Sequence, residues 1–169
     1  MEQTLLMDSL RCEQLWRRHA DRLLLYATTV LADRSAAEDA LQNVFVRLMA
    51  SPPEDISSEA GYLFRAVRNE ALNSIRSRRL AARALPPLFD DLAEDPRESA
   101  ELAERGRQVE EVLLRLESQE REAVVLKIWG DLSIPEAAAI AGVTEKTFEH
   151  RYYRGLAALK EKLGDLGHD

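Results

Sequence analysis

Apolar residues recur every three or four positions along most of the chain, and this spacing limits the fold to helices. The clearest run steps by three and one in alternation: Leu41, Val44, Phe45, Leu48 and Met49. A second run steps by three or four: Phe148, Tyr152, Leu156, Leu159 and Leu163. Such steps place side chains on one face of an α-helix, whereas a half-buried strand needs strict alternation. Because the 169 residues include only 7 Gly and 6 Pro, we predict an all-α fold.

An acidic segment punctuated by proline divides the chain into two small helical domains. Residues 86–106 form this segment, which predicts an interdomain linker with a short helical piece near 98–104. The first domain, residues 1–85, is predicted to hold helices near 11–31, 36–49 and 58–84. The second domain, residues 107–169, is predicted to hold helices near 107–116, 119–129, 135–141 and 145–163.

Three helix starts have recognisable capping residues. Ser35 and Glu38 have the spacing of a capping box, and so do Ser133 and Glu136. Thr144 is predicted to cap the last helix, after a tight turn at Gly142. The sequence therefore predicts where three of the seven helices begin.

The composition argues against a secreted protein, a membrane protein and an enzyme. Cys12 is the only cysteine, so no internal disulfide can form and a reducing, cytoplasmic compartment is expected. The N-terminus lacks the basic cluster of a secretory signal, and the longest apolar stretch, residues 23–32, is too short to span a bilayer. The three histidines are far apart, and we find neither a phosphate loop nor a metal-ligand spacing. We therefore predict no catalytic residue, no metal and no cofactor.

The net charge of −7 argues weakly against a nucleic-acid partner, but it conceals two blocks of opposite sign. Residues 60–85 carry six arginines against one acid, whereas residues 86–106 carry seven acids against two arginines. Clustered cations displace the counterions condensed on DNA. The arginine-rich helix also holds Asn69 and Asn73, whose amides can contact bases, and Tyr62, whose ring can stack on one. We expect a nucleic-acid interface here, although a solvated arginine face would give the same pattern.

Residues 133–153 have the pattern of a helix-turn-helix: a short capped helix, a turn with glycine and a longer helix. In this motif the second helix enters the major groove by its first turns. A plain helical hairpin with a charged face is the alternative. A third polar group, Asp39, Gln42 and Asn43, lies off an apolar stripe and is either a solubilising face or a docking surface.

The order of these parts resembles the extracytoplasmic-function (group IV) sigma factors of the sigma-70 family. Residues 33–45, DRSAAEDALQNVF, resemble their polymerase-binding stretch. Residues 63–73, LFRAVRNEALN, look like their promoter-melting helix, and residues 116–163 are similar to their region 4. The resemblance covers nearly the whole chain and implies a promoter-directing initiation factor rather than an enzyme.

The resemblance implies three sets of site residues. The set implied to bind the β′ subunit of core polymerase is Asp39, Gln42 and Asn43. The set implied to hold the −10 promoter element is Tyr62, Arg65, Arg68, Asn69, Asn73 and Arg76. The set implied to contact the −35 element is Glu145, Lys146, Thr147, Glu149, His150, Arg151 and Arg154. It also implies that residues 50–61 capture a flipped base, that region 4 touches the β subunit, and that an anti-sigma factor is a possible partner.

Glu149 is the main departure from the family pattern, because that position is usually basic. The sequence therefore leaves open a sigma-like regulator that binds proteins and has lost promoter activity. A simple operator-binding repressor is a third candidate, but it would not explain the first domain.

Overall fold

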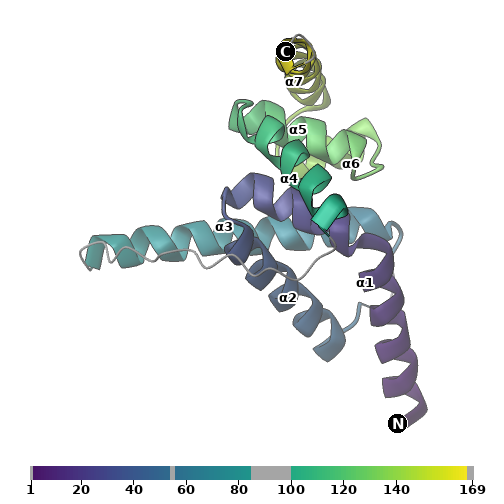
Figure 1. The fold of residues 1–169 in the computed structure, drawn as a ribbon. Helices are drawn as coiled ribbons and strands as arrows, with labels where there is room; N and C mark the ends of the chain where they lie inside the picture. The colour runs from purple at the N-terminus through teal and green to yellow at the C-terminus, as the bar shows by residue number, and fades with distance from the viewer. Residues whose placement is uncertain (1, 54–55, 85–99, 167–169) are drawn as a thin grey trace.

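The structure is a computed structural model that describes residues 2–53, 56–84 and 100–166 (Figure 1). All regular elements in these ranges are α-helices, which confirms the predicted fold class. The helices are α1 Glu2–Leu31, α2 Arg34–Ala50, α3 Glu59–Ala84, α4 Ala100–Leu114, α5 Ser118–Ile128, α6 Ile134–Ala141 and α7 Glu145–Leu166. Of the described helices, none is long and apolar enough to cross a membrane.

The first domain consists of α1, α2 and α3, each of which contacts the other two. The apolar stripe of α2 is buried as predicted at Leu41, Val44, Phe45 and Leu48. Met49 was expected in this stripe, but its side chain is 55% exposed. It lies in the last turn of α2, so the apolar run extends beyond the contacts that bury its earlier members.

The start of α2 differs from the predicted capping box. Asp33 has an extended backbone, and its carboxylate accepts a hydrogen bond from the Ala36 amide at 3.0 Å. The helix therefore begins at Arg34, and Ser35 is already inside its first turn. The predicted cap at Ser35 was wrong because an aspartate two residues earlier satisfies the free N–H groups of that turn.

The second domain consists of α4 to α7, and its predicted turn chemistry is confirmed. Ser133 and Glu136 form a complete capping box. Gly142 adopts the left-handed conformation at φ 71°, and the Thr144 hydroxyl accepts a hydrogen bond from the Thr147 amide at 3.2 Å. α6 and α7 therefore form the expected helix-turn-helix.

The axis of α7 passes very close to α5 at Gly155. A Cβ atom at this glycine would lie 2.6 Å from Val124 Cγ2 and 2.9 Å from the carbonyl oxygen of Glu120. The predicted stripe of α7 is fully buried at Phe148, but Leu163 is 51% exposed. Its burial was therefore predicted wrongly, because the stripe continues past the part of α7 that the core covers.

Two predicted helix starts were too late. α1 begins at Glu2 rather than near residue 11, and α4 begins at Ala100 rather than near residue 107. Residues 100–106, which were expected in the linker, are therefore helical, and they include most of the short helical piece expected near 98–104. The expected linker residues 86–99 lie outside the described residues.

The two domains pack against each other. α4 and α5 contact α1, and α6 contacts α3, as Figure 1 shows above the middle of the molecule. Buried apolar side chains form one cluster that runs from the first domain into the second. The far half of α3 instead projects away from the body, and residues 76–83 are all exposed.

Candidate nucleic-acid interface

One exposed stripe on α3 carries most of the residues predicted to bind DNA. Its members follow each other at steps of three or four and are Tyr62, Arg65, Asn69, Asn73 and Arg76. The buried residues Phe64, Val67 and Ala71 occupy the opposite side of the helix. The stripe combines cations, amides and a partly exposed aromatic ring. This chemistry can hold phosphates, contact base edges and stack on an unpaired base.

Arg68 does not share this stripe. Its side chain is only 22% exposed, and its Nε donates to Glu122 Oε1 of α5 at 2.8 Å. Its Nη2 donates to the carbonyl oxygen of Ala141, at the end of α6, at 3.2 Å. Burial lowers the pKa of Arg68, but the hydrogen bond and charge of Glu122 outweigh burial and raise it overall. Arg68 thus joins the two domains in this structure.

Tyr26 of α1 contacts the same carboxylate oxygen. Its hydroxyl donates to Glu122 Oε1 at 2.8 Å, and its ring packs on Phe64 at a centroid distance of 5.2 Å. Burial, followed by the negative charge of Glu122, raises the pKa of Tyr26 well above its ordinary value. The tyrosine is therefore a neutral hydrogen-bond donor beneath the interdomain contact.

The residues predicted to bind polymerase point to two different sides of α2. Asp39 and Gln42 lie on the exposed outer face. The Asn43 amide instead donates to Glu70 Oε1 of α3 at 3.1 Å, and Arg47 forms an ion pair with the same carboxylate. Glu70 therefore ties α2 to α3.

Two apolar members of this outer face were not predicted from the sequence. Val46 is 64% exposed and Met49 is 55% exposed. Both follow Asp39 and Gln42 at helical steps of three or four, so the row Asp39, Gln42, Val46 and Met49 lies on one side of α2. The spacing contained this signal, but the apolar character of Met49 suggested the core instead.

The predicted major-groove residues of α7 also divide into groups. The exposed centre of the face is formed by Lys146, Glu149 and His150, joined by Tyr153, which is 66% exposed. Glu145, at the helix start, is exposed as well, and Arg151 is only partly exposed. Thr147 bonds to the capping residue Thr144, and Arg154 forms an ion pair with Glu120 of α5 at 3.0 Å. Both side chains stay exposed, so each has a partner within the domain and also borders the exposed face.

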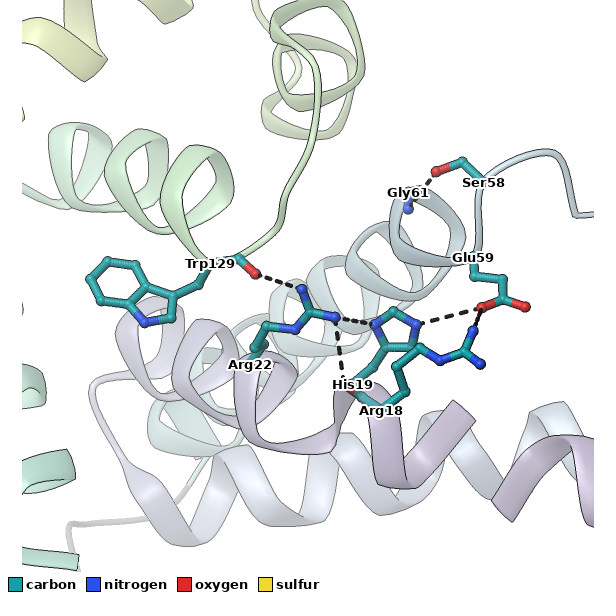
Figure 2. A network of polar contacts seen from close by, with 7 residues as sticks. All are labelled: Arg18, His19, Arg22, Ser58, Glu59, Gly61 and Trp129. Carbon is teal, nitrogen blue, oxygen red and sulfur yellow. Dashed lines mark hydrogen bonds and ion pairs between the residues drawn. The ribbon is translucent and has the colours of Figure 1, made fainter. Parts of the chain in front are cut away.

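A polar network holds the start of α3 against α1 (Figure 2). Arg22 donates to His19 Nδ1 at 2.9 Å, which leaves the ring proton on Nε2, 3.6 Å from Glu59 Oε2. Arg18 pairs with the same Glu59 oxygen at 2.9 Å. Burial, followed by the charge of Arg22, lowers the pKa of His19, although Glu59 opposes this shift. This role of His19 was not predicted from the sequence.

The same network reaches the second domain. Arg22 also donates to the carbonyl oxygen of Trp129 at 3.3 Å, just after α5 (Figure 2). Near the start of α3, a Cβ at Gly61 would lie 3.8 Å from Glu136 Oε1 of α6. Hydrogen bonds from Ser133 lower the pKa of Glu136, and one from the Ser58 hydroxyl contributes. The helix-turn-helix domain therefore covers the end of the loop before α3.

Two family matches cover the two domains. Residues 15–81 match Sigma-70 region 2, and residues 106–159 match Sigma-70, region 4. The RNA polymerase sigma-E factor of Streptomyces coelicolor is 31% identical over 92% of this chain and 88% of its own length. The chain belongs to the sigma-70 family. It is an RNA polymerase sigma factor of the extracytoplasmic-function group, a protein that acts in transcription initiation.

Two further relatives of this chain are also named ECF sigma factors. The ECF RNA polymerase sigma factor SigM of Mycobacterium tuberculosis is 32% identical over 94% of this chain and 80% of its own length. The ECF RNA polymerase sigma factor SigE of Mycolicibacterium smegmatis is 32% identical over 89% of this chain, which spans 61% of that relative. Region 2 corresponds to α1–α3, and the region 4 match begins inside α4.

Two solved structures have the same fold as this chain. One is the sigma factor RpoE of Bartonella quintana in complex with the anti-sigma factor NepR, at a TM-score of 0.68 and 25% identity, covering 90% of this chain and 96% of that one. Another is CnrH in complex with the cytosolic domain of CnrY, at a TM-score of 0.63 and 26% identity, covering 97% and 94%. The region 2 match accounts for the first domain, which a simple operator-binding repressor would not.

Proposed function

We propose that this sigma factor docks on core RNA polymerase through α2 and contacts promoter DNA through α3 and α7. The exposed stripe of cations, amides and one aromatic ring on α3 carries the proposal. Core polymerase works in the cytoplasm, and we place the protein there. As in its family, the work of this chain is to bind and position, and the chemistry of RNA synthesis belongs to the polymerase.

The proposed polymerase surface is the outer face of α2. Asp39 and Gln42 supply hydrogen bonds and charge, and the exposed Val46 and Met49 supply apolar area beside them. Asn43 was expected in the same contact through family resemblance, and we propose it for the edge of this surface because its amide is bonded to Glu70. A mixed surface of this kind fits an exposed helical segment of the β′ subunit.

The proposed −10 surface is the α3 stripe. Asn69 and Asn73 are placed to contact bases of the melted strand, Tyr62 to stack on one, and Arg65 and Arg76 to hold phosphates. Arg68 belongs to this set only when it is released from Glu122. The loop before α3 is the proposed pocket for a flipped base.

The proposed −35 surface is the exposed face of α7. Lys146 is suited to a phosphate or a guanine, and Glu149 to accept a hydrogen bond from a cytosine amino group. His150 and Tyr153 extend the face along the groove, with Glu145 at its start. Thr147, Arg151 and Arg154 flank this face and are proposed as phosphate contacts at its border.

The second candidate function is a regulator that binds proteins but has lost promoter activity. Both solved relatives are held by a protein partner. On this basis we propose an anti-sigma factor as a partner of this chain. The acidic Glu149 is the observation that favours a loss of promoter activity.

Run-off transcription separates the two candidates. The chain is mixed with bacterial core polymerase on a library of genomic promoter fragments, and transcripts are sequenced. We expect defined start sites that disappear without the chain. Asn73→Ala should reduce permanganate reactivity of the open promoter while leaving binding to duplex −35 DNA unchanged. A chain that binds core polymerase and yields no start site would support the regulator instead.

A further inference from the structure

The carboxylate of Glu122 on α5 contacts two helices of region 2 at once. Its Oε1 accepts a hydrogen bond from Tyr26 of α1 and another from Arg68 of α3, each at 2.8 Å. The Glu122 side chain is 17% exposed and the Arg68 side chain 22%. Hydrogen bonds to a charged group are stronger than neutral ones, and partial removal from water strengthens them further.

The atoms of Arg68 engaged here are the ones a phosphate would need. Its Nε is bound to Glu122 and its Nη2 to the carbonyl oxygen of Ala141. Arg68 lies next to the proposed −10 stripe, because it directly precedes Asn69 in the sequence. A DNA strand lying along this stripe would therefore compete with Glu122 for the same guanidinium group.

A second contact lies at the start of the stripe. Glu136 of α6 reaches the Ser58 hydroxyl and lies near Gly61, at the end of the loop proposed to capture a base. A carboxylate at this point repels DNA phosphates. Region 4 thus covers the loop end and also binds Arg68, which lies beside the stripe.

The packing of region 4 on region 2, here called closure, leaves two of the three proposed binding surfaces exposed. Asp39 and Gln42 on α2 stay exposed, and so do Lys146, Glu149 and His150 on α7. Closure therefore leaves the proposed polymerase and −35 surfaces accessible. Its contacts on region 2 are made by α1, by Arg34 at the start of α2 and by α3 beside the proposed −10 surface.

We infer that Glu122 latches region 4 onto region 2 in an autoinhibited state, and that promoter DNA must displace Glu122 from Arg68 to bind the −10 surface. The inference rests on the proposed function of the α3 stripe. A protein that binds only from a minor open state has an affinity reduced by the open fraction. Weakening the latch should therefore increase the affinity for single-stranded DNA.

The test compares the wild-type chain with Glu122→Lys, which replaces the latch by repulsion from Arg68. Small-angle X-ray scattering measures closure, and fluorescence anisotropy measures binding of a short fluorescein-labelled single-stranded oligonucleotide of random sequence. We expect a larger radius of gyration and an affinity increased about fivefold or more. Glu161→Lys makes the same change of charge at an exposed position of α7 away from the contact, and it controls for charge alone.

Two further variants keep the test decisive if Glu122→Lys folds poorly by circular dichroism. Tyr26→Phe removes one hydrogen bond to Glu122 while keeping the aromatic packing, and it should open the protein to a smaller extent. The exchange Arg68→Glu with Glu122→Arg should restore the compact scattering profile.

The inference is overturned if Glu122→Lys and Tyr26→Phe stay as compact as the wild type. It is equally overturned if they open but bind the oligonucleotide no better than Glu161→Lys. Failure of the proposed function has a different signature, which is the absence of run-off transcription by wild type and variants alike. In that case the scattering data still report closure, and autoinhibition of promoter binding is rejected together with the proposed function.

Discussion

Glu149 lies on the exposed face of α7 beside Lys146 and His150. In the proposed −35 contact, a carboxylate at this position would have two opposing effects on DNA binding. It would repel the phosphates of every sequence, and it would favour sequences that offer an amino group in the major groove. In this proposal Glu149 lowers the affinity for DNA in general and raises the preference for particular −35 sequences.

Glu149→Lys should raise general duplex affinity and relax the preference between −35 sequences. One base contact provides about 1–3 kcal/mol of discrimination. The salt dependence should steepen by roughly one to two ion equivalents, because a repelling charge becomes an attracting one. Titrations at several salt concentrations on preferred and scrambled duplexes measure both effects. An unchanged salt slope and preference would place Glu149 away from the DNA.

His19 links stability to pH. Because its pKa is lower in the folded protein than the ordinary value of 6.5, the unfolded chain binds more protons below that pH. The stability contributed by neutral His19 is complete above pH 6.5 and is lost as the pH falls toward the folded pKa. Arg18, Arg22 and Glu59 are the charged groups that face the ring (Figure 2).

We therefore expect the free energy of unfolding to fall as the pH drops below about 6.5, before most carboxylates begin to titrate. His19→Gln keeps an acceptor for Arg22 but does not titrate, so its unfolding free energy should change less over this range. Urea unfolding at several pH values measures the difference. Parallel profiles for the two proteins would contradict this role of His19.

Helices were the part of this fold that the sequence predicted best. Periodicity fixes which side of a helix is buried, and this gave the core residues Phe45, Phe64 and Phe148. Periodicity does not say how far along a helix its partner extends, so Met49 and Leu163 were wrongly expected in the core.

The candidate site was less predictable. Helical periodicity shows on which face of its own helix a residue lies, but it does not show which residues of other helices that side chain contacts. Arg68 lies between the stripe and the buried face, and it was assigned to DNA with the other basic residues. Only the packing of α5 and α6 on region 2 brings Glu122 and Ala141 to its guanidinium group. The role of His19 also depends on groups distant in sequence, above all Glu59.

The crossing of α5 and α7 depends on a single glycine. At Gly155 an added methyl group would meet Val124 Cγ2 and the Glu120 carbonyl oxygen, and a backbone atom cannot move aside as a flexible side chain can. Gly155→Ala should therefore destabilise region 4 by about 1–3 kcal/mol.

Such a loss corresponds to a drop in melting temperature of roughly 2–4 °C per kcal/mol in a chain of this size. Differential scanning calorimetry measures it. Gly164→Ala is the matched control, because a Cβ there has no neighbour within 4 Å. An equal effect of both substitutions would show that helix propensity, rather than the close crossing, determines the result.

On the scale of the whole molecule, docking on polymerase should be independent of the latch. Asp39 is on the exposed outer face of α2, and this helix touches region 4 at its first residue, Arg34, through an ion pair with Glu110 of α4. Asp39→Arg should weaken binding to core polymerase about tenfold, or about 1.4 kcal/mol, with no loss of folding. A pull-down series against core polymerase measures the affinity, and undiminished binding by a folded variant would remove Asp39 from the interface.

The shared use of Arg68 has a consequence for how the intact protein responds to ionic strength. Salt weakens the attraction of Arg68 for Glu122 as well as its attraction for a phosphate. Added salt therefore opens the protein while it weakens DNA binding, and the two effects partly cancel. The logarithm of affinity for single-stranded DNA should fall less steeply for the wild-type chain than for Glu122→Gln, by up to about one ion equivalent. The number of phosphate contacts calculated from the salt dependence of the wild-type protein would then be an underestimate.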